Sequence, residues 1–460
     1  MNTKQLFNNQ TITLKRTVLM SMMAMSLGGL SLSTQAQTPA QSNQQEIEQL
    51  RQEVQALRAL IEQQQTQTAA VTAPVAATPA PANTAVAPAS KPVMKIASGA
   101  EFNLYGNIRA DASYQAEGGA ATRMYNQINA VPLEGTGERS DEFKSTLSAT
   151  RLGMDFKAPV GAGDKALSGK VEVDFLGGAS FDNLRIRHAY ISYADWLIGQ
   201  TWSNFATPDY IPETVDALVY AGGSIKRTPQ IRHTSTLSPA TNLVLAVEDP
   251  KDATITGIKQ RLPALTARLN HKFADNLSVS VRAMGNEIRI NNKDKSVNDD
   301  EKMAWGVGLG AKYEFVPGTS LKADYYHVKG DSSFVSYANP GVIAAGGNLY
   351  QSEFDSITVG LTQQFNDKLR GTLGYGYMNF DDDQDYINAL SATDKTKANK
   401  DLWQAWANVF YNPTKPLSLG LEYVYGEREA YGPVLNTEGN AISSRKGEDN
   451  RINAVAIYSF

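Results

Sequence analysis

Positively charged residues recur in segments of this sequence where apolar and polar residues alternate. Arg151, for example, has the opposite parity to Leu152, Met154 and Phe156. A guanidinium can hold a carboxylate through two parallel hydrogen bonds, so an arginine-lined face could bind small anions. If the apolar parity faces lipid, an arginine there would cost about 2 to 4 kcal/mol near the midplane, which favours the inner face. Isolated arginines on a solvated surface are the alternative. The residues predicted to line the inner face are Arg109, Arg151, Arg185, Arg187, Lys226, Arg232, Arg268, Arg282 and Arg370.

A long link of unusual composition, residues 204–224, carries three acidic side chains. It is too apolar for a loop in water, so we predict that it folds back inside the structure. Asp209, Glu213 and Asp216 would then face the arginines and form a constriction with a transverse field. Alternatively, these acids stabilise the start of a short helix near residues 212–218.

The elements that must position these residues are β-strands. In residues 417–425 the leucines and tyrosines occupy every second position, which is the period of a strand with two different faces. The last strand, residues 451–460, ends on Phe460 with the same alternation, which suggests a strand that closes a sheet without a free edge. We count sixteen strands between Glu101 and Phe460. The predicted fold is an all-β transmembrane barrel of 16 antiparallel strands with an N-terminal α-helical coiled coil.

The links between these strands alternate in length. Short breaks alternate with long polar links, as in outer-membrane barrels with short periplasmic turns and long external loops. An even strand count places both barrel ends on the periplasmic side. A soluble sandwich or propeller is the alternative, although no repeat of about 40 residues supports a propeller. The long links are residues 115–144, 204–224, 248–260, 290–301, 330–351, 381–400 and 426–447.

The N-terminus has the pattern of an export signal. Lys4, Lys15 and Arg16 precede an apolar run over residues 17–32 and a small-residue cleavage site, so residues 1–36 are predicted to be a signal peptide. Removing it changes the net charge from −4 to 40 − 47 = −7, which offers no general attraction to nucleic acid.

A short heptad repeat follows the signal. The apolar a and d positions within residues 37–64 are Ile47, Leu50, Val54, Leu57 and Ile61. Glutamates at g and arginines at e allow ion pairs between parallel chains, which predicts an oligomerisation coil of dimeric preference. A lone amphipathic helix packed on its own domain is the alternative. Residues 65–97, rich in alanine and proline, are predicted to be an extended linker to the barrel at residues 98–460.

Enzymatic chemistry finds little support in the sequence. The chain contains no cysteine, and no glycine-rich phosphate loop appears. The four histidines, His188, His233, His271 and His327, share the parity of apolar neighbours, which predicts that none faces the lumen. We therefore expect no enzyme activity, no metal and no cofactor.

Several segments together resemble a known family. FNLYGNIR at 102–109, TRLG at 150–153, RHAYI at 187–191, IGQTW at 198–202 and terminal Phe460 resemble general trimeric porins. PETVD at 212–216 and PQIR at 229–232, with the coil and linker, are similar to the DcaP-like porins of Gram-negative bacteria. The resemblance implies a sixteen-stranded homotrimer in outer-membrane lipid, with the coil in the periplasm and a channel preferring dicarboxylates and other small organic anions. The dimer-favouring heptad departs from that pattern.

These observations favour a passive diffusion porin, in which inward arginines hold a carboxylate weakly and the acidic link narrows the path. Two other interpretations remain open. One is a structural tether, with the barrel as an anchor for the coil. The other is an outer-membrane hydrolase.

Overall fold

The computed structural model of the chain describes residues 93–96, 99–119, 124–137, 139–160, 166–178, 182–250, 258–290 and 301–460. All of them belong to one compact unit that spans residues 88–460. The predicted signal peptide, coiled coil and most of the linker lie outside the described residues. No helix in the described part of the chain is both long and apolar enough to cross a membrane.

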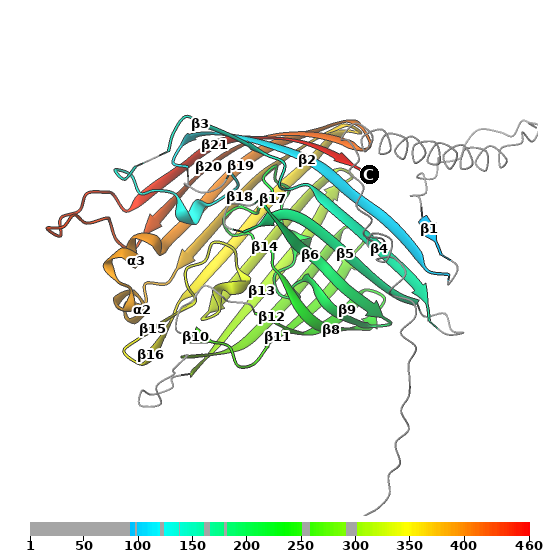
Figure 1. Ribbon diagram of the computed structural model, residues 1–460, viewed down its shortest axis with the longest axis horizontal. Helices are drawn as coiled ribbons and strands as arrows, with labels where there is room; N and C mark the ends of the chain where they lie inside the picture. Colours follow the sequence, from blue (N-terminus) through cyan, green and yellow to red (C-terminus); the bar gives the residue numbers. More distant parts are fainter. Residues whose placement is uncertain are drawn as a thin grey trace, which may run out of the picture. The chain divides into compact units, whose positions relative to one another are not determined.

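The described residues form a closed antiparallel barrel (Figure 1). Its sheet has 19 strands, but three of these are short pieces: β1 (Val93–Lys95), β3 (Glu142–Thr146) and β10 (Ile258–Lys259). β3 continues the path of β4 along β2, and β10 continues that of β11 along β12. The remaining 19 − 3 = 16 strands confirm the predicted count.

The sixteen barrel strands are β2 (Glu101–Glu117), β4 (Arg151–Pro159), β5 (Ala166–Gly177), β6 (Asn183–Tyr193), β7 (Trp196–Trp202), β8 (Arg227–Ser238), β9 (Thr241–Glu248), β11 (Ala264–Ala274), β12 (Leu277–Ile290), β13 (Glu301–Val316), β14 (Thr319–Lys329), β17 (Glu353–Asn366), β18 (Leu369–Phe380), β19 (Asn399–Thr414), β20 (Leu417–Ala430) and β21 (Lys446–Ser459). Each pairs with its neighbours along the chain, and β21 pairs with β2. Figure 1 shows this seam, with β2 in blue beside β21 in red.

The two faces of the barrel differ as the alternation predicts. On β20, Leu421 is 54% exposed on the outer face, whereas the next residue, Glu422, is only 1% exposed. Large apolar side chains recur on the outer face of the other strands, and charged or amide side chains are buried on the inner face. The outside of the barrel is therefore suited to lipid, and the inside holds the polar chemistry.

Phe460 lies at the seam. Its N–H donates to Gly106 O, and Gly106 N–H donates to Phe460 O, both at 3.1 Å. Its ring covers Gly106, where a Cβ atom would lie only 2.8 Å from Phe460 Cζ. Glycine at this position leaves room for the terminal aromatic ring.

The long links contain short helices, strands and 3₁₀ turns. They include the 3₁₀ turns η1 (Ile128–Ala130), η2 (Pro208–Tyr210) and η3 (Ser332–Phe334), the strands β15 (Val342–Ala345) and β16 (Asn348–Gln351), and the helices α2 (Gln384–Ala389) and α3 (Ala392–Lys397). The side chains of Asp383 and Ser391 accept N–H bonds at the starts of α2 and α3. The short helix considered near residues 212–218 is absent; η2 lies just before that segment instead.

Three of the links pack together on the inner side of the barrel. Ile128, Phe205 and Phe334, each from a different link, belong to one buried apolar cluster. Strand residues Phe354 and Leu402 complete it on the wall. Part of the barrel interior is consequently a packed core rather than an open channel.

Candidate functional site in the barrel lumen

The link between β7 and β8, residues 203–226 and here called the inner loop, folds back against the barrel wall. Phe205, Tyr210, Val215 and Tyr220 are buried in it. Its hydrogen bonds and ion pairs to the wall fall on strands from β9 through β21 and on β2. Burial of these apolar side chains explains why the loop is not extended into water.

Glycines on the wall make room for the inner loop. A Cβ at Gly310 would lie 2.2 Å from the Tyr210 ring, and one at Gly360 would lie 2.4 Å from Pro212 Cβ. Several strand glycines allow side chains of the loop, and at Gly376 its backbone, to pack closely against the wall. The set comprises Gly306, Gly310, Gly360, Gly376 and Gly420.

Three cations of the wall donate to successive carbonyl groups of the inner loop. The contacts are Arg282 Nη1 to Phe205 O (3.1 Å), Lys322 Nζ to Ile211 O (3.2 Å) and Arg109 Nη2 to Val215 O (2.5 Å). Arg109 and Arg282 are both buried, and each also pairs with an acid on the wall. Both were predicted to line a pore; the structure instead buries them where they hold the loop.

Each acidic residue of the inner loop lies directly against one arginine. The pairs are Asp209 with Arg268 (2.9 Å), Glu213 with Arg370 (2.7 Å) and Asp216 with Arg451 (3.3 Å). The sequence predicted that these acids would face arginines across a gap. In the structure each acid contacts its arginine directly, so the two charges cancel much of each other's field. These ion pairs attach the loop to the wall. Arg451 was not among the predicted residues, although it has the inner parity of the last strand.

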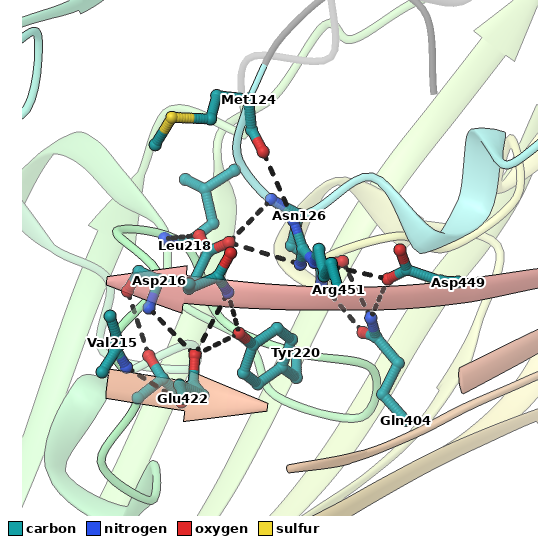
Figure 2. Close-up of polar contacts among 12 residues, drawn as sticks. Met124, Asn126, Val215, Asp216, Leu218, Tyr220, Gln404, Glu422, Asp449 and Arg451 are labelled. Carbon is teal, nitrogen blue, oxygen red and sulfur yellow. Dashed lines mark hydrogen bonds and ion pairs between the residues drawn. The ribbon is translucent and has the colours of Figure 1, made fainter. Parts of the chain in front are cut away.

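The tip of the inner loop is held by a buried carboxylate on β20 (Figure 2). Glu422 accepts hydrogen bonds from Val215 N (2.9 Å), Asp216 N (3.3 Å) and the Tyr220 hydroxyl. Asn408 and other neighbours donate to the same carboxylate. Because a buried carboxylate requires several donors, Glu422 fixes the loop tip tightly. Sequence reasoning missed this residue, since its donors lie about two hundred positions earlier.

A second contact network joins the inner loop to the link between β2 and β3 (Figure 2). Asn126 N donates to Asp216 Oδ2 at 3.0 Å, and Asn126 Nδ2 donates to Gln404 Oε1 at 2.9 Å. Gln404 in turn donates to Asp449 at 3.0 Å. Two long links are therefore fastened to the same part of the wall.

Asp216 is the buried acid of this network. Burial raises its pKa to about 6, against the opposing effects of Arg451 and the N–H of Leu218. Nearby Glu422 raises it further. Asp216 is consequently poised to change charge between pH 5 and 7.

The next part of the wall, which follows β2 in the order of the barrel strands, carries a basic cluster. Arg151, Asp174 and Arg185 are side by side across β4, β5 and β6. Arg185 binds Asp174 through two hydrogen bonds of 2.9 and 2.7 Å. Arg187 binds both Glu172 (2.5 Å) and Asp174 (3.0 Å). The acids of β5 therefore orient the two β6 arginines.

A β-bulge at Arg187 changes which histidines face inward. Glu172 pairs with His188 and Val173 with Ile186, so Arg187 is an extra residue in β6. His188 is buried, with Nδ1 3.0 Å from Thr201 Oγ1. The prediction that His188 shares the apolar outer parity is wrong, because one inserted residue reverses the alternation.

The other three histidines keep the outer parity. Their rings lie beside outer-face aromatic rings, at centroid distances of 4.5, 4.4 and 5.3 Å. The pairs are His233 with Trp196, His271 with Phe273 and His327 with Trp305.

Two cations at the start of β8, Lys226 and Arg227, have roles that the sequence did not predict. Lys226 was predicted within a strand, but β8 begins at Arg227. Lys226 Nζ donates to Ser333 Oγ at 2.7 Å and lies 4.4 Å from the Phe334 ring centroid, so it holds the link before β15. Arg227, which we did not predict, interacts electrostatically with Arg151, Arg185 and Arg187.

Several solved structures of known proteins are similar to this chain. The outer membrane channel DcaP of Acinetobacter baumannii is 36% identical, with a TM-score of 0.70 over 80% of this chain and 99% of that chain. An anion-selective porin from Comamonas acidovorans is 12% identical, with a TM-score of 0.52 over 78% of this chain and 100% of that chain. OmpT of Vibrio cholerae in its trimer form is 14% identical, with a TM-score of 0.49 over 78% and 99%.

No curated protein matches the chain. The model of a family described as DcaP outer membrane protein matches residues 30–458. That match covers nearly the whole sequence, barrel and inner loop included. The chain therefore belongs to the DcaP family of outer-membrane proteins, and it is a porin-type channel rather than an enzyme.

Proposed function

We propose that this porin mediates passive diffusion of small organic anions, dicarboxylates among them, along the basic cluster and past the inner loop. The channel binds its solute weakly, converts nothing and consumes no energy. The similarity to a DcaP channel supports transport, and the charge distribution in the lumen supports the preference for anions.

The observation that most directly supports this preference is the excess of positive charge in the basic cluster on β4, β5, β6 and the start of β8. Within the cluster, the four arginines listed below meet two acids, so the excess is 4 − 2 = +2. Lys170 of β5 and Asp155 of β4 pair with each other and do not change this sum. The acids of the inner loop are already paired with other arginines. Such an excess inside a low-dielectric wall concentrates anions and repels cations. The arginines are Arg151, Arg185, Arg187 and Arg227, and the acids are Glu172 and Asp174.

The test is the reversal potential of the purified protein in a planar bilayer with a potassium chloride gradient. We expect a potential of the sign set by chloride, and a current that succinate blocks at lower concentration than acetate. A cation-selective channel would contradict the proposal. A protein that conducts no ions would favour the structural tether instead.

We further propose that the protein is a homotrimer, with the face around β7 against a neighbouring copy. β7 has seven residues and β9 has eight, the shortest strands of the barrel. A tilted strand of that length rises only about 17 Å, less than an apolar band of about 25 Å. A second copy would cover the part of the bilayer that this low wall leaves unmatched.

Cysteine crosslinking tests this interface, because the chain has no cysteine of its own. Ile198 on β7 and Leu309 on β13 are exposed to similar extents on the outer face. We expect the variant Ile198→Cys, and not Leu309→Cys, to give covalent dimers and trimers with a short bifunctional maleimide. Crosslinking of Leu309→Cys alone would assign the interface to a different face.

The segments before the barrel complete the proposal. We propose that residues 1–36 are removed on export and that residues 37–64 form a periplasmic coil. The predicted linker, residues 65–97, would then end before residue 93, because Val93–Lys95 form β1 and pair with β2. Deleting residues 37–92, which spares the strand β1 that pairs with β2, should leave conductance and anion preference unchanged, because an extended linker shares no core with a barrel. Failure of the shortened protein to fold in detergent would overturn this division.

A further inference from the structure

The inward arginines of the described residues differ in what they bind. Most already donate to an acidic side chain of the same barrel, which leaves them limited capacity for a passing anion. The pairs are Arg109–Asp111, Arg185–Asp174, Arg187–Glu172, Arg268–Asp209, Arg282–Asp324, Arg370–Glu213 and Arg451–Asp216.

Within the basic cluster, Arg151 on β4 and Arg227 at the start of β8 are the exceptions. Neither guanidinium makes a hydrogen bond or ion pair to another described residue. Arg232, farther along β8 and also predicted to line the lumen, lies outside the cluster and likewise has no ion pair with a described residue. Arg151 Nε and Arg227 Nη1 are shielded from solvent and still lack an acceptor. The side chains of Arg151 and Arg227 are otherwise partly exposed. Donors left in this state are costly unless a ligand or water supplies the acceptor.

The surroundings of Arg227 strengthen this reading. Its guanidinium carbon lies 4.4 Å from the centroid of the Trp202 ring, which supports it from one side. Arg227 also interacts with the like charges of Arg151, Arg185 and Arg187, and Asp174 opposes them in part. An anion bound there would relieve this repulsion.

We propose that Arg151 and Arg227 together bind the two carboxylates of a small dicarboxylate, and that Trp202 is a positioning residue for Arg227. This inference rests on the proposed anion channel and deepens it. Arg185 and Arg187 contribute charge to the same wall, but their donors are engaged by the acids of β5. Each free guanidinium can instead present a fork of N–H groups to a carboxylate.

A double-mutant cycle of Arg151→Gln and Arg227→Gln tests the two-point site. The readout is the concentration of succinate, or of acetate, that halves the current of the full-length protein. We expect each single variant to weaken succinate block about tenfold, in line with the loss of one charged hydrogen-bonding partner. The double variant should lose less than the product of the two, because one carboxylate contact without the other is already weak. For acetate the two effects should multiply.

The matched control removes two arginines outside the lumen. Arg261 and Arg289 both pair with Glu287, and the variant Arg261→Gln with Arg289→Gln loses the same total charge. We expect its succinate block to stay within twofold of the native protein. Trp202→Leu should weaken succinate block several-fold, and Trp202→Phe should restore most of it, because a ring again supports Arg227.

The outcomes separate this site from the proposed function. If succinate blocks the Arg151→Gln, Arg227→Gln double variant as strongly as the native protein, the two-point site is wrong and the anion channel still stands. Multiplicative effects for succinate would also overturn it. A native protein that shows neither anion preference nor succinate block would overturn both.

Discussion

Two regions of the barrel interior use the same residue type in opposite ways. From β11 through β21, and at β2, most inward arginines contact carboxylates or carbonyl groups of the inner loop. Arg428 on β20 instead donates to carbonyl groups of two other links. On β4 and β8, Arg151 and Arg227 have no such partner in the described part of the chain. One region therefore anchors a loop, and the other retains charge and donors for a solute. An inward arginine alone does not identify a binding site; its partners decide its role.

The largest effect should come from removing the anchor of the loop. Glu422→Leu would leave the backbone N–H groups of Val215 and Asp216 without an acceptor, at about 1 to 3 kcal/mol for each buried donor. We expect a lower unfolding temperature and a large rise in open-channel current noise. Glu427→Gln on the outer parity of the same strand is the control. Equal noise in the two variants would show that the loop is held by other contacts.

The next effect concerns charge in the two regions. Arg185→Gln with Arg187→Gln leaves Glu172 and Asp174 unpaired, so we expect several-fold lower anion-to-cation permeability. The shift should shrink at 1 M salt, where the Debye length is about 3 Å.

Neutralising the loop acids should act in the opposite direction. Asp209→Asn with Glu213→Gln frees Arg268 and Arg370, so the channel should become more anion-selective. Reversal potentials that stay unchanged in both double variants would mean that neither region borders the permeation path.

The smallest effect should follow from pH. Burial raises the Asp216 pKa to about 6 from a usual value of 3.8, so folding disfavours the ionised form. The stability associated with the protonated form is present below pH 3.8 and is lost as the pH rises through 6.

Between pH 7 and 5, protonation of Asp216 removes one negative charge from the loop. Anion preference should therefore increase modestly, with a midpoint near pH 6, and Asp216→Asn should abolish that dependence. The same pH dependence in Asp216→Asn would assign it to another group.

The sequence predicted the features that follow from period and link length. Alternation in strands such as residues 417–425 predicted the barrel and its two faces, because side chains on a strand reverse with each residue. The composition of residues 204–224 predicted a loop that avoids water. Both depend on neighbours in the sequence.

Features that depend on distant partners escaped prediction. Parity predicted that Arg282 faces inward. It did not predict that Asp324 and Phe205 O would accept hydrogen bonds from its guanidinium. The bulge at Arg187 reversed His188 without any signal in the alternation itself. Glu422 and the wall glycines gain their roles only once the loop is folded against them.

The central claim is that solutes pass along the basic cluster and not behind the inner loop. Modification of single cysteines during current recording tests it directly, since the native chain contains none. Arg227→Cys lies in the cluster, whereas Ser356→Cys lies behind the loop, where Ser356 Oγ donates to Gly222 O at 3.0 Å. We predict that a negatively charged thiosulfonate reagent reduces the current through Arg227→Cys and leaves Ser356→Cys unchanged. A reagent that reduces the current through Ser356→Cys and leaves the current through Arg227→Cys unchanged would contradict this claim.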